Sequence, residues 1–500
     1  MHICPEALDQ ARLALRREAW TRNGAAGAIA DRLVALGQPI GPLNDNAGAI
    51  LRETERLTPA ALATLIEETL PGIERTLHMT LCIAAMNDTA QTEAIDPAMA
   101  VVFVRALTPL AGLRTYPHAA LFRPADAAIL ERVCAEPLAT ARHPARHAVT
   151  GIVKITRACN LRCSYCHDWR AGPGSGMPPA TQARAMRWLI AGSRAAKVNV
   201  LLHGGEPTIV GVRGLLRLLA FQAAMMMPGQ QIRTSLQTNA TLLTPALLEL
   251  LVRFDIGVSV SLDGPPEVHD QTRRDIRGEG SSDRVRTGIA MLQDKGLLSG
   301  VIVVVTPALI AAGALRLVGH LLDCGVESAA LIAQRPGHDE AVDAASTLPV
   351  SDYCTFLLAV EGVRRRIAPQ LDVREIDAAE KAVRGLPPRT CELQGSCVGH
   401  YFTIEPDGAV SHCDKFLGDP YATLGTVFDP FEDVARGAAA ERLRARGAAT
   451  LEPLTECRWR QQCRGWCPHE RDVAARSGAP GDCCGLNTLF EGLDAMGEVA

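Results

Sequence analysis

Three cysteines place the strongest constraint on how this chain folds. Cys159, Cys163 and Cys166 follow the apolar run 151–156 with the spacing CxxxCxxC. A short β-branched apolar run predicts a buried strand, so the three thiols should share one tight loop at the end of that strand. Thiolates are soft ligands that suit zinc, copper(I) and iron–sulfur clusters. Three of them leave one corner of a cubic [4Fe–4S] cluster without a protein ligand, where a small molecule can coordinate the iron.

A zinc site is the alternative interpretation of the same loop. Structural zinc sites usually complete a tetrahedron with a fourth Cys or His, and His167 directly follows Cys166. The residues farther along the chain distinguish the two, and they favour the cluster.

From residue 151 onward, short β-branched runs alternate with amphipathic stretches. The expected strands are 151–156, 198–203, 232–237, 256–262, 300–305 and 328–333, and the expected helices are Thr181–Ala196, Val212–Met226, Pro245–Arg253, Ser282–Lys295 and Gly313–Cys324. This alternation predicts parallel strands joined by right-handed crossovers. Six such units predict an α/β fold with a partial (βα)₆ barrel, whose chemistry would lie at the carboxyl ends of the strands.

Polar motifs follow three of the expected strands. The second is followed by Gly204-Gly205-Glu206-Pro207, where glycines let the backbone approach a ligand and the proline fixes a turn. The third ends at Gln237-Thr238-Asn239, whose asparagine could also begin a helix. Ser261, Asp263 and, farther on, Arg273 follow the fourth, although Arg273 could equally be a solvated helix charge.

The cysteine loop, with Tyr165 before its third cysteine, and the GGEP motif one strand later resemble radical S-adenosylmethionine (radical SAM) enzymes. The resemblance implies that SAM chelates the open iron through its amino and carboxyl groups. An electron from the cluster then splits SAM, and a 5′-deoxyadenosyl radical takes a hydrogen atom from the substrate. The cofactor carries this chemistry, and the protein supplies placement and excludes side reactions.

The resemblance also implies a SAM pocket. Glu206 would bind the SAM amino group, and Ser261 and Arg273 match residues that hold the SAM carboxylate in anaerobic sulfatase-maturating enzymes, a task that suits a guanidinium. Leu331 would pack on the adenine, although an apolar strand residue is core by default. The implied SAM-binding residues are Tyr165, Gly204, Gly205, Glu206, Gln237, Asn239, Ser261, Arg273 and Leu331.

The end of the chain is also rich in cysteine: Cys391, Cys397, Cys413, Cys457, Cys463, Cys467, Cys483 and Cys484. The segment 402–410 predicts a β-hairpin with an Asp-Gly turn. The arrangement resembles the SPASM extension, a module with auxiliary [4Fe–4S] clusters in enzymes that act on peptides and proteins. By analogy, the first auxiliary cluster would use Cys391, Cys397, Cys413 and Cys467, and the second Cys457, Cys463 and a residue of the pair Cys483/Cys484. Two Cys₄ zinc sites are the alternative.

Two positions depart from the family pattern. Leu454 stands where the pattern has the first cysteine of a CxxC, and Phe490 stands where sulfatase-maturating members have their final cysteine. Cys483 and Cys484 are adjacent and rarely would both reach one cluster. The second cluster is therefore expected to have three cysteine ligands, a non-cysteine ligand, or a site open to substrate.

The resemblance implies a function as well. Asp414 matches the general base of sulfatase maturases, with a capping aspartate as the alternative, and Lys415 beside it is expected to lower its pKa. The leading hypothesis is a peptide- or protein-modifying oxidoreductase that abstracts hydrogen from a ribosomally made precursor peptide and then oxidises or cross-links it. Its electron donor would be a flavodoxin or ferredoxin. The alternatives are formylglycine formation on a sulfatase and a zinc-stabilised scaffold without enzymatic activity.

Composition bounds the remaining possibilities. A 500-residue chain with 47% hydrophobic residues predicts several globular domains: an amino-terminal extension at 1–148 that could recognise substrate, a radical SAM core at 149–337, a helical bridge at 338–390 and a SPASM-like domain at 391–500. A net charge of −4 without basic runs argues against nucleic-acid binding. No signal sequence or membrane span is evident, which predicts a cytoplasmic protein.

Overall fold

The fold was analysed in a computed structural model, which describes residues 126, 129, 132–133, 145–169, 175–225, 230–335, 347–388, 390–395, 397–416, 418–451, 457–476 and 485–498. The expected elements before residue 126, most of the amino-terminal extension, Leu454 and the pair Cys483/Cys484 lie outside these residues. The chain divides into two compact units. Unit 1 comprises residues 1–148, 178–198 and 210–232, and unit 2 comprises residues 149–177, 199–209 and 233–500.

Unit 1 contains two of the expected helices. Helix α8 (Pro179–Met186) continues into the π-helical segment Arg187–Gly192, and α9 spans Gly211–Met225. The two are joined by Arg217, whose Nε donates to Gln182 Oε1 at 3.0 Å. The helix expected over 181–196 therefore ends at Gly192, and residues 195–196 already belong to the next strand.

The strands form one ten-stranded sheet, ordered β10-β9-β8-β1-β2-β3-β4-β5-β6-β7. Strands β1 to β6 lie in sequence order, which confirms the predicted α/β fold with its (βα)₆ arrangement. The strands are β1 (Ala145–Thr156), β2 (Ala195–Gly204), β3 (Gln231–Thr238), β4 (Gly257–Ser261), β5 (Leu298–Val305), β6 (Ser328–Ala333), β7 (Asp372–Val373), β8 (Tyr401–Ile404), β9 (Ala409–Ser411) and β10 (Thr423–Thr426).

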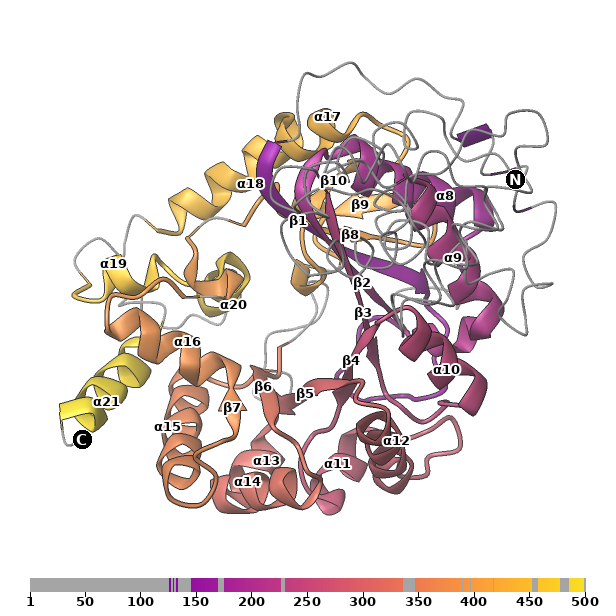
Figure 1. The fold of residues 1–500 in the computed structure, drawn as a ribbon. Helices are drawn as coiled ribbons and strands as arrows, with labels where there is room; N and C mark the ends of the chain where they lie inside the picture. Colours follow the sequence, from indigo (N-terminus) through magenta and orange to yellow (C-terminus); the bar gives the residue numbers. More distant parts are fainter. Residues whose placement is uncertain are drawn as a thin grey trace, which may run out of the picture. The chain divides into compact units, whose positions relative to one another are not determined.

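Helices follow most strands of unit 2 (Figure 1). They are α10 (Pro245–Arg253), α11 (Pro266–Thr272), α12 (Ser282–Asp294), α13 (Pro307–Ala312), α14 (Ala314–Asp323), α15 (Val350–Ile367), α16 (Arg374–Val383), α17 (Phe431–Arg436), α18 (Ala438–Ala449), α19 (Arg460–Cys463), α20 (Pro468–Arg476) and α21 (Asn487–Glu498). Thr244 and Thr306 begin α10 and α13 in the same way, since each hydroxyl accepts a main-chain N–H three residues later and a proline follows. Among the described helices, none is long and apolar enough to cross a membrane.

The register separates the two faces of the central strands. Val258 and Val260 of β4 and Val303 of β5 are fully buried on one face. Ser259 and Ser261 alternate with them and share the other face with Gln237 of β3. Side chains alternate between the faces of a sheet, so the polar face of β3 and β4 is the one available to a ligand.

The predicted hairpin joins the carboxy-terminal module to this sheet. Strands β8 and β9 pair antiparallel through the Asp407-Gly408 turn, where Gly408 has φ of 92°. Strand β8 also pairs parallel with β1, with Ile152 opposite Thr403. The segment that carries Cys397 and Cys413 therefore lies in the sheet directly beside β1, the strand that leads into the Cys159 loop.

Candidate functional site

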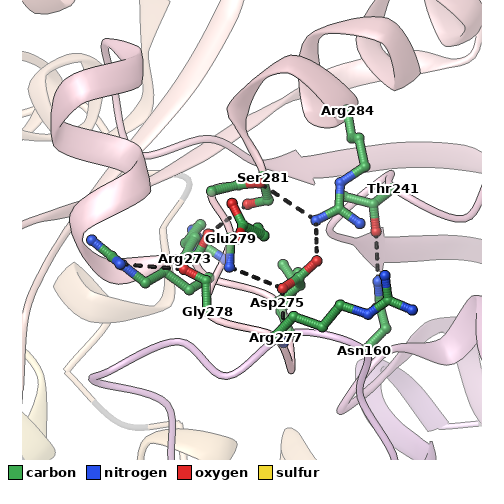
Figure 2. A network of polar contacts seen from close by, with 12 residues as sticks. Asn160, Thr241, Arg273, Asp275, Arg277, Gly278, Glu279, Ser281 and Arg284 are labelled. Carbon is green, nitrogen blue, oxygen red and sulfur yellow. Dashed lines mark hydrogen bonds and ion pairs between the residues drawn. The ribbon is translucent and has the colours of Figure 1, made fainter.

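The cysteine loop is held by the last residue of α11 and the segment that follows it. Arg162 N–H donates to Arg274 O at 2.6 Å and Ser164 N–H donates to Thr272 O at 3.0 Å, while Leu161 bridges Asp275. The loop has no regular structure of its own, so these main-chain bonds fix its course. Figure 2 shows the neighbouring polar contacts, including those of Asp275 with Arg284 and of Asn160 with Thr241.

The thiols of Cys159, Cys163 and Cys166 lie close enough to influence one another electrostatically. Burial is the largest cause that raises their pKa values, to about 12 for Cys159 and about 11 for Cys163; neighbouring thiolates add to the effect at Cys159 and Cys163, and Asp168 adds to it at Cys166. A bound cation reverses this situation because it stabilises thiolates directly. Three neighbouring thiols on one loop, of which Cys163 is buried and Cys159 and Cys166 are partly exposed, thus have the donor chemistry that an iron–sulfur cluster requires.

Within the described residues, no group of three or more His, Cys, Asp or Glu side chains is gathered closely enough to hold a single metal ion. This finding concerns mononuclear sites such as zinc. In a cubane each thiolate binds a different iron atom, so its ligands are spaced more widely.

The two glycines of the GGEP motif pack against the cysteine loop. A Cβ on Gly204 would overlap the carbonyl oxygen of Thr156, and one on Gly205 would overlap those of Arg157 and Ala158. Gly205 N–H donates to Thr156 O at 2.9 Å. The sequence prediction assigned these glycines to close approach of a ligand, whereas the structure shows a close approach between two loops.

Glu206 is buried beneath the same contact. Its Oε1 accepts hydrogen bonds from the main chain and hydroxyl of Thr208 and from the hydroxyl of Thr238, and its Oε2 accepts from Asn239 N–H at 2.7 Å. Both carboxylate oxygens therefore bind the protein. Its predicted role toward the SAM amino group stays a prediction.

The Gln237 and Asn239 side chains connect neighbouring parts of the predicted pocket. Gln237 Nε2 donates to Ser261 Oγ at 2.9 Å. Asn239 Nδ2 donates to Asn160 Oδ1 at 2.9 Å, and Asn160 Nδ2 donates to Thr241 Oγ1 at 2.8 Å. Asn160 lies inside the CxxxCxxC loop, and the sequence analysis did not identify it because its partners are about 80 residues away.

Asp263 is the centre of the polar contacts around Arg273. Arg273 Nε donates to Asp263 Oδ2 at 2.9 Å, Tyr165 Oη donates to the same oxygen, and Val304 N–H donates to Oδ1 at 3.0 Å. Arg273 also lies 3.9 Å from Cys163 Sγ and 5.5 Å from the centre of the Tyr165 ring. Burial alone would raise the pKa of Asp263, but the Arg273 guanidinium holds it below its usual value.

These residues form a closed ring of hydrogen bonds, which we call the Asp263 ring. Asp263 N–H donates to His269 Nδ1 at 3.1 Å, which leaves the proton on Nε2, 3.0 Å from Ser281 Oγ. Ser281 Oγ in turn donates to Arg273 O at 2.7 Å, and Arg273 Nε returns to Asp263. Burial lowers the pKa of His269 to about 4, so the imidazole is neutral. The ring fixes both the main chain and the side chain of Arg273.

Leu331 does not join the other predicted SAM residues. It pairs with Val303, is fully buried and lies on the face opposite Ser261. Its N–H donates to Glu375 Oε2 at 2.7 Å and its carbonyl accepts from Tyr353 Oη at 2.5 Å. Glu375 and Tyr353 therefore bind the main-chain N–H and C=O of Leu331, which lie beyond the two residues of β6 that pair with β7. The default interpretation, a core residue, describes Leu331 in this structure.

A buried ammonium lies between the two ends of the cysteine loop. Lys154 Nζ is 2.6 Å from Asp168 Oδ1 and 3.5 Å from Glu405 Oε1, and Arg157 Nη2 is 2.6 Å from Glu405 Oε2. Burial alone would lower the pKa of Lys154, but Asp168, Glu405 and Asp414 hold it above its usual value. The sequence analysis placed Lys154 in an apolar strand and missed this group.

The cysteines predicted to bind the first auxiliary cluster lie near one another. Cys391 acts electrostatically on Cys397, and Cys467 on Cys413, and burial raises the pKa of all four thiols. As with the loop cysteines, these thiols have the donor chemistry for a cluster; Cys467 is buried and the other three are partly exposed.

A histidine and a cavity adjoin this cysteine group. His412 Nδ1 faces the carbonyl of Tyr401 at 3.1 Å and must carry the proton there, so its Nε2 faces Cys397 Sγ at 3.3 Å with a lone pair. A cavity of about 220 Å³ borders His412, Cys397, Phe416 and Arg444.

Of the cysteines expected at the second auxiliary cluster, Cys457 and Cys463 belong to the described residues, and the pair Cys483/Cys484 does not. Cys463 is buried and its Sγ accepts the N–H of Gly465 at 3.3 Å. Phe490, which the resemblance sets at the place of the final cysteine in sulfatase-maturating members, is fully buried, and its ring centre lies 5.6 Å from that of Trp459. An aromatic pair therefore lies where that expectation would put a ligand.

Asp414 follows Cys413 and acts electrostatically on Lys154. Lys415 turns to other partners, since its Nζ is 2.6 Å from Glu392 Oε1 and 3.3 Å from Glu470 Oε1. Its charge is therefore balanced by two carboxylates other than Asp414.

Comparisons with known proteins bear on the family and the fold. The model of the Radical SAM superfamily matches residues 153–309. The serine-type anaerobic sulfatase-maturating enzyme of Klebsiella aerogenes is 26% identical over 65% of this chain and 80% of its own length. The cysteine-type enzyme of Clostridium perfringens is 23% identical over 64% of this chain and 89% of its own length.

Among solved structures, native anSMEcpe with bound AdoMet and Cp18Cys peptide superposes with a TM-score of 0.63 at 21% identity, covering 71% of this chain and 98% of its own. That likeness supports the fold. Radical SAM enzymes use SAM and [4Fe–4S] clusters, and the three loop thiols described above fit that requirement. Residues 153–309 are therefore a radical SAM domain, and the chain is similar to anaerobic sulfatase-maturating enzymes over about two thirds of its length.

Proposed function

We propose that this enzyme is an oxidoreductase that modifies a peptide or protein. The observation that carries the proposal is the pairing of β1 with β8, which joins the Cys159 loop to the segment with Cys397 and Cys413 in one sheet. Such a sheet would hold a SAM-binding cluster and an auxiliary cluster at fixed separation, with the substrate residue between them.

When bound, SAM and its cluster supply the one-electron chemistry that removes a hydrogen atom from carbon. Cys159, Cys163 and Cys166 would hold the cluster. Arg273, oriented by the Asp263 ring, would bind the SAM carboxylate with the part of its guanidinium that Asp263 does not occupy. Burial of these groups excludes water from the reacting atoms.

Asp414 would accept a proton from the substrate. It lies beside Cys413, and its charge acts on the buried Lys154. A carboxylate at this place can take up a proton while Cys391, Cys397, Cys413 and Cys467 hold the cluster that receives the electron. A flavodoxin or ferredoxin would supply electrons to the SAM-binding cluster.

Two substrate classes are compatible with this chemistry. A ribosomally made precursor peptide is favoured by Leu454 and Phe490, which stand where the family pattern has cysteines, and by the long segment 1–148 that precedes the radical SAM core. A sulfatase, with formylglycine as product, is favoured by the names of the curated relatives and by the Asp414 match.

Co-expression with neighbouring genes tests the proposal. The enzyme is produced anaerobically with an adjacent short peptide or, separately, with a sulfatase, and each is analysed by mass spectrometry. Loss of two hydrogen atoms with no reaction toward a carbonyl probe indicates cross-linking or dehydrogenation, whereas a product that the probe labels indicates formylglycine. Cys163→Ala is the control and should abolish both SAM cleavage and product. Product formation by this variant would refute the assignment of the loop.

A further inference from the structure

Two arginines beside the cysteine loop each have a buried N–H group without a hydrogen-bond partner. In the described part of the chain, these groups are Nη1 of Arg157 and Nη2 of Arg335. The two side chains are 14% and 8% exposed. A buried donor without a partner loses its hydrogen bonds to water with nothing in return, so native proteins rarely leave one unless a ligand or water completes it.

Other buried polar atoms without partners occur among the described residues, including His203 Nδ1 near Asp168 and His469 Nδ1 near Glu470. Arg157 and Arg335 are the two arginines of this set that contact the cysteine loop or precede it directly. Arg157 precedes Cys159 by two residues, and its Nη2 binds Glu405, just after β8, at 2.6 Å. Arg335 follows β6, its carbonyl accepts from His167 Nε2 at 3.3 Å, and its Nε binds Glu470 at 2.5 Å.

Each arginine therefore connects one end of the cysteine loop to the carboxy-terminal module. Glu405 begins the hairpin turn that leads to Cys413, and Glu470 lies three residues after Cys467. Through these contacts both arginines lie between the cysteine loop and the carboxy-terminal module, which carry the predicted ligands of the two clusters.

The charges around both arginines are already balanced. Lys154 and Arg157 face Asp168 and Glu405. Around Arg335, the ammonium of Lys415 and the guanidinium face Glu392 and Glu470. Asp414 adds a further negative charge. An acidic side chain would therefore be buried without compensation, whereas a neutral acceptor would satisfy the N–H groups without adding charge.

We infer that Arg157 and Arg335 are substrate-binding residues whose free N–H groups donate hydrogen bonds to main-chain carbonyl oxygens of the peptide. This rests on the proposed function, because it requires a peptide between the clusters. Glu405 holds the guanidinium of Arg157 and Glu470 holds that of Arg335, so that one N–H group of each faces the substrate. These two ion pairs would position the peptide relative to both clusters.

Arg157→Lys and Arg335→Lys test the inference. Lysine retains the positive charge and can still pair with the carboxylate, but it lacks the second N–H edge of a guanidinium. Arg364→Lys is the matched control, since Arg364 also pairs with a buried glutamate, Glu361, at 2.6 Å. Its Nη1 reaches the main-chain carbonyls of Pro369 and Leu371.

The reconstituted enzyme is assayed with the peptide or protein that it modifies in the co-expression experiment. Each substrate-site variant should raise the KM for that substrate about fivefold, which corresponds to about 1 kcal/mol at 1.4 kcal/mol per tenfold. The KM for SAM, the iron content and the rate of SAM cleavage without peptide should stay at wild-type values. The variants should also yield less modified product for each SAM cleaved.

The outcomes separate the inference from the proposed function. A wild type that modifies its substrate while both variants keep its KM within twofold would overturn the inference and leave the function intact. An equal rise in Arg364→Lys would overturn it too, because a general loss of stability would then explain the effect. If the wild type modifies neither a peptide nor a sulfatase, the proposed function fails and the inference fails with it.

Discussion

Replacing Asp263 with asparagine tests the role of the Asp263 ring. Asp263 is fully buried and Arg273 is 7% exposed, so the substitution removes the negative partner of a buried guanidinium. Loss of one partner from a buried ion pair costs about 3–5 kcal/mol because the remaining charge is uncompensated. The hydrogen bond from Tyr165 would also lose its charged acceptor. We therefore expect a fall of this size in the free energy of unfolding and at least a tenfold rise in the KM for SAM.

The assay combines denaturant unfolding of the reconstituted enzyme with the rate of 5′-deoxyadenosine formation at varied SAM concentrations. A double variant, Asp263→Asn with Arg273→Met, separates stability from SAM binding. Removing both charges should recover much of the lost stability, while SAM binding stays impaired because the guanidinium is gone. Asp275→Asn is the control, since Asp275 caps the adjacent turn and pairs with Arg284 but lies outside the ring. An Asp263→Asn variant with a wild-type free energy of unfolding and a KM for SAM within twofold would refute the reasoning.

Three further predictions concern separate parts of the site. Gly205→Ala places a methyl group against the carbonyls of Arg157 and Ala158, so SAM cleavage should fall at least tenfold, whereas Gly362→Ala, with open space around its Cβ position, should cleave SAM at the wild-type rate. Asp414→Asn should leave SAM cleavage intact and slow product formation; an unchanged product yield would reject the proton-accepting role. For His269, the folded pKa of about 4 lies below the unfolded value of about 6.5, so stability is lost as pH falls through this window. Between pH 7 and 5.5 this residue should cost about 1 kcal/mol, and unfolding midpoints of His269→Gln should depend less on pH than those of the wild type.

Local sequence predicted the parts of the fold that depend on local patterns. Helix α10 has the expected bounds, and β5 and β6 agree within two residues, because β-branched runs and Thr-Pro helix starts act over a few positions. The two-residue strand β7 and the short helices α11 and α13 were not predicted. They are too short for a periodic pattern, and β7 exists because β6 offers it an edge.

The site shows the same division between local and distant interactions. The sequence motifs predicted which residues bind the cluster and SAM. They did not predict which other side chains hold those residues in position. Asp263, Asn160 and Lys154 bind partners far along the chain or on another strand. Leu331 could not be assigned to a face from the sequence alone, because an apolar run buried on both faces lacks alternation.

The pairing of β1 with β8 fixes the position of the loop cysteines relative to those of the carboxy-terminal module. Neither cysteine motif predicts this from the sequence. Residues 150–153 pair with 401–404, so the strand before the Cys159 loop and the strand before Cys413 share one register. Beyond that pairing, Lys154 and Arg157 contact Glu405, and at the other end of the loop Arg335 reaches Glu470. A shift of the carboxy-terminal module would therefore break buried charge pairs at both ends of the loop. Such pairs are costly to break singly, so the sheet and these five charged side chains together should keep the separation of the two predicted clusters fixed while the substrate between them changes.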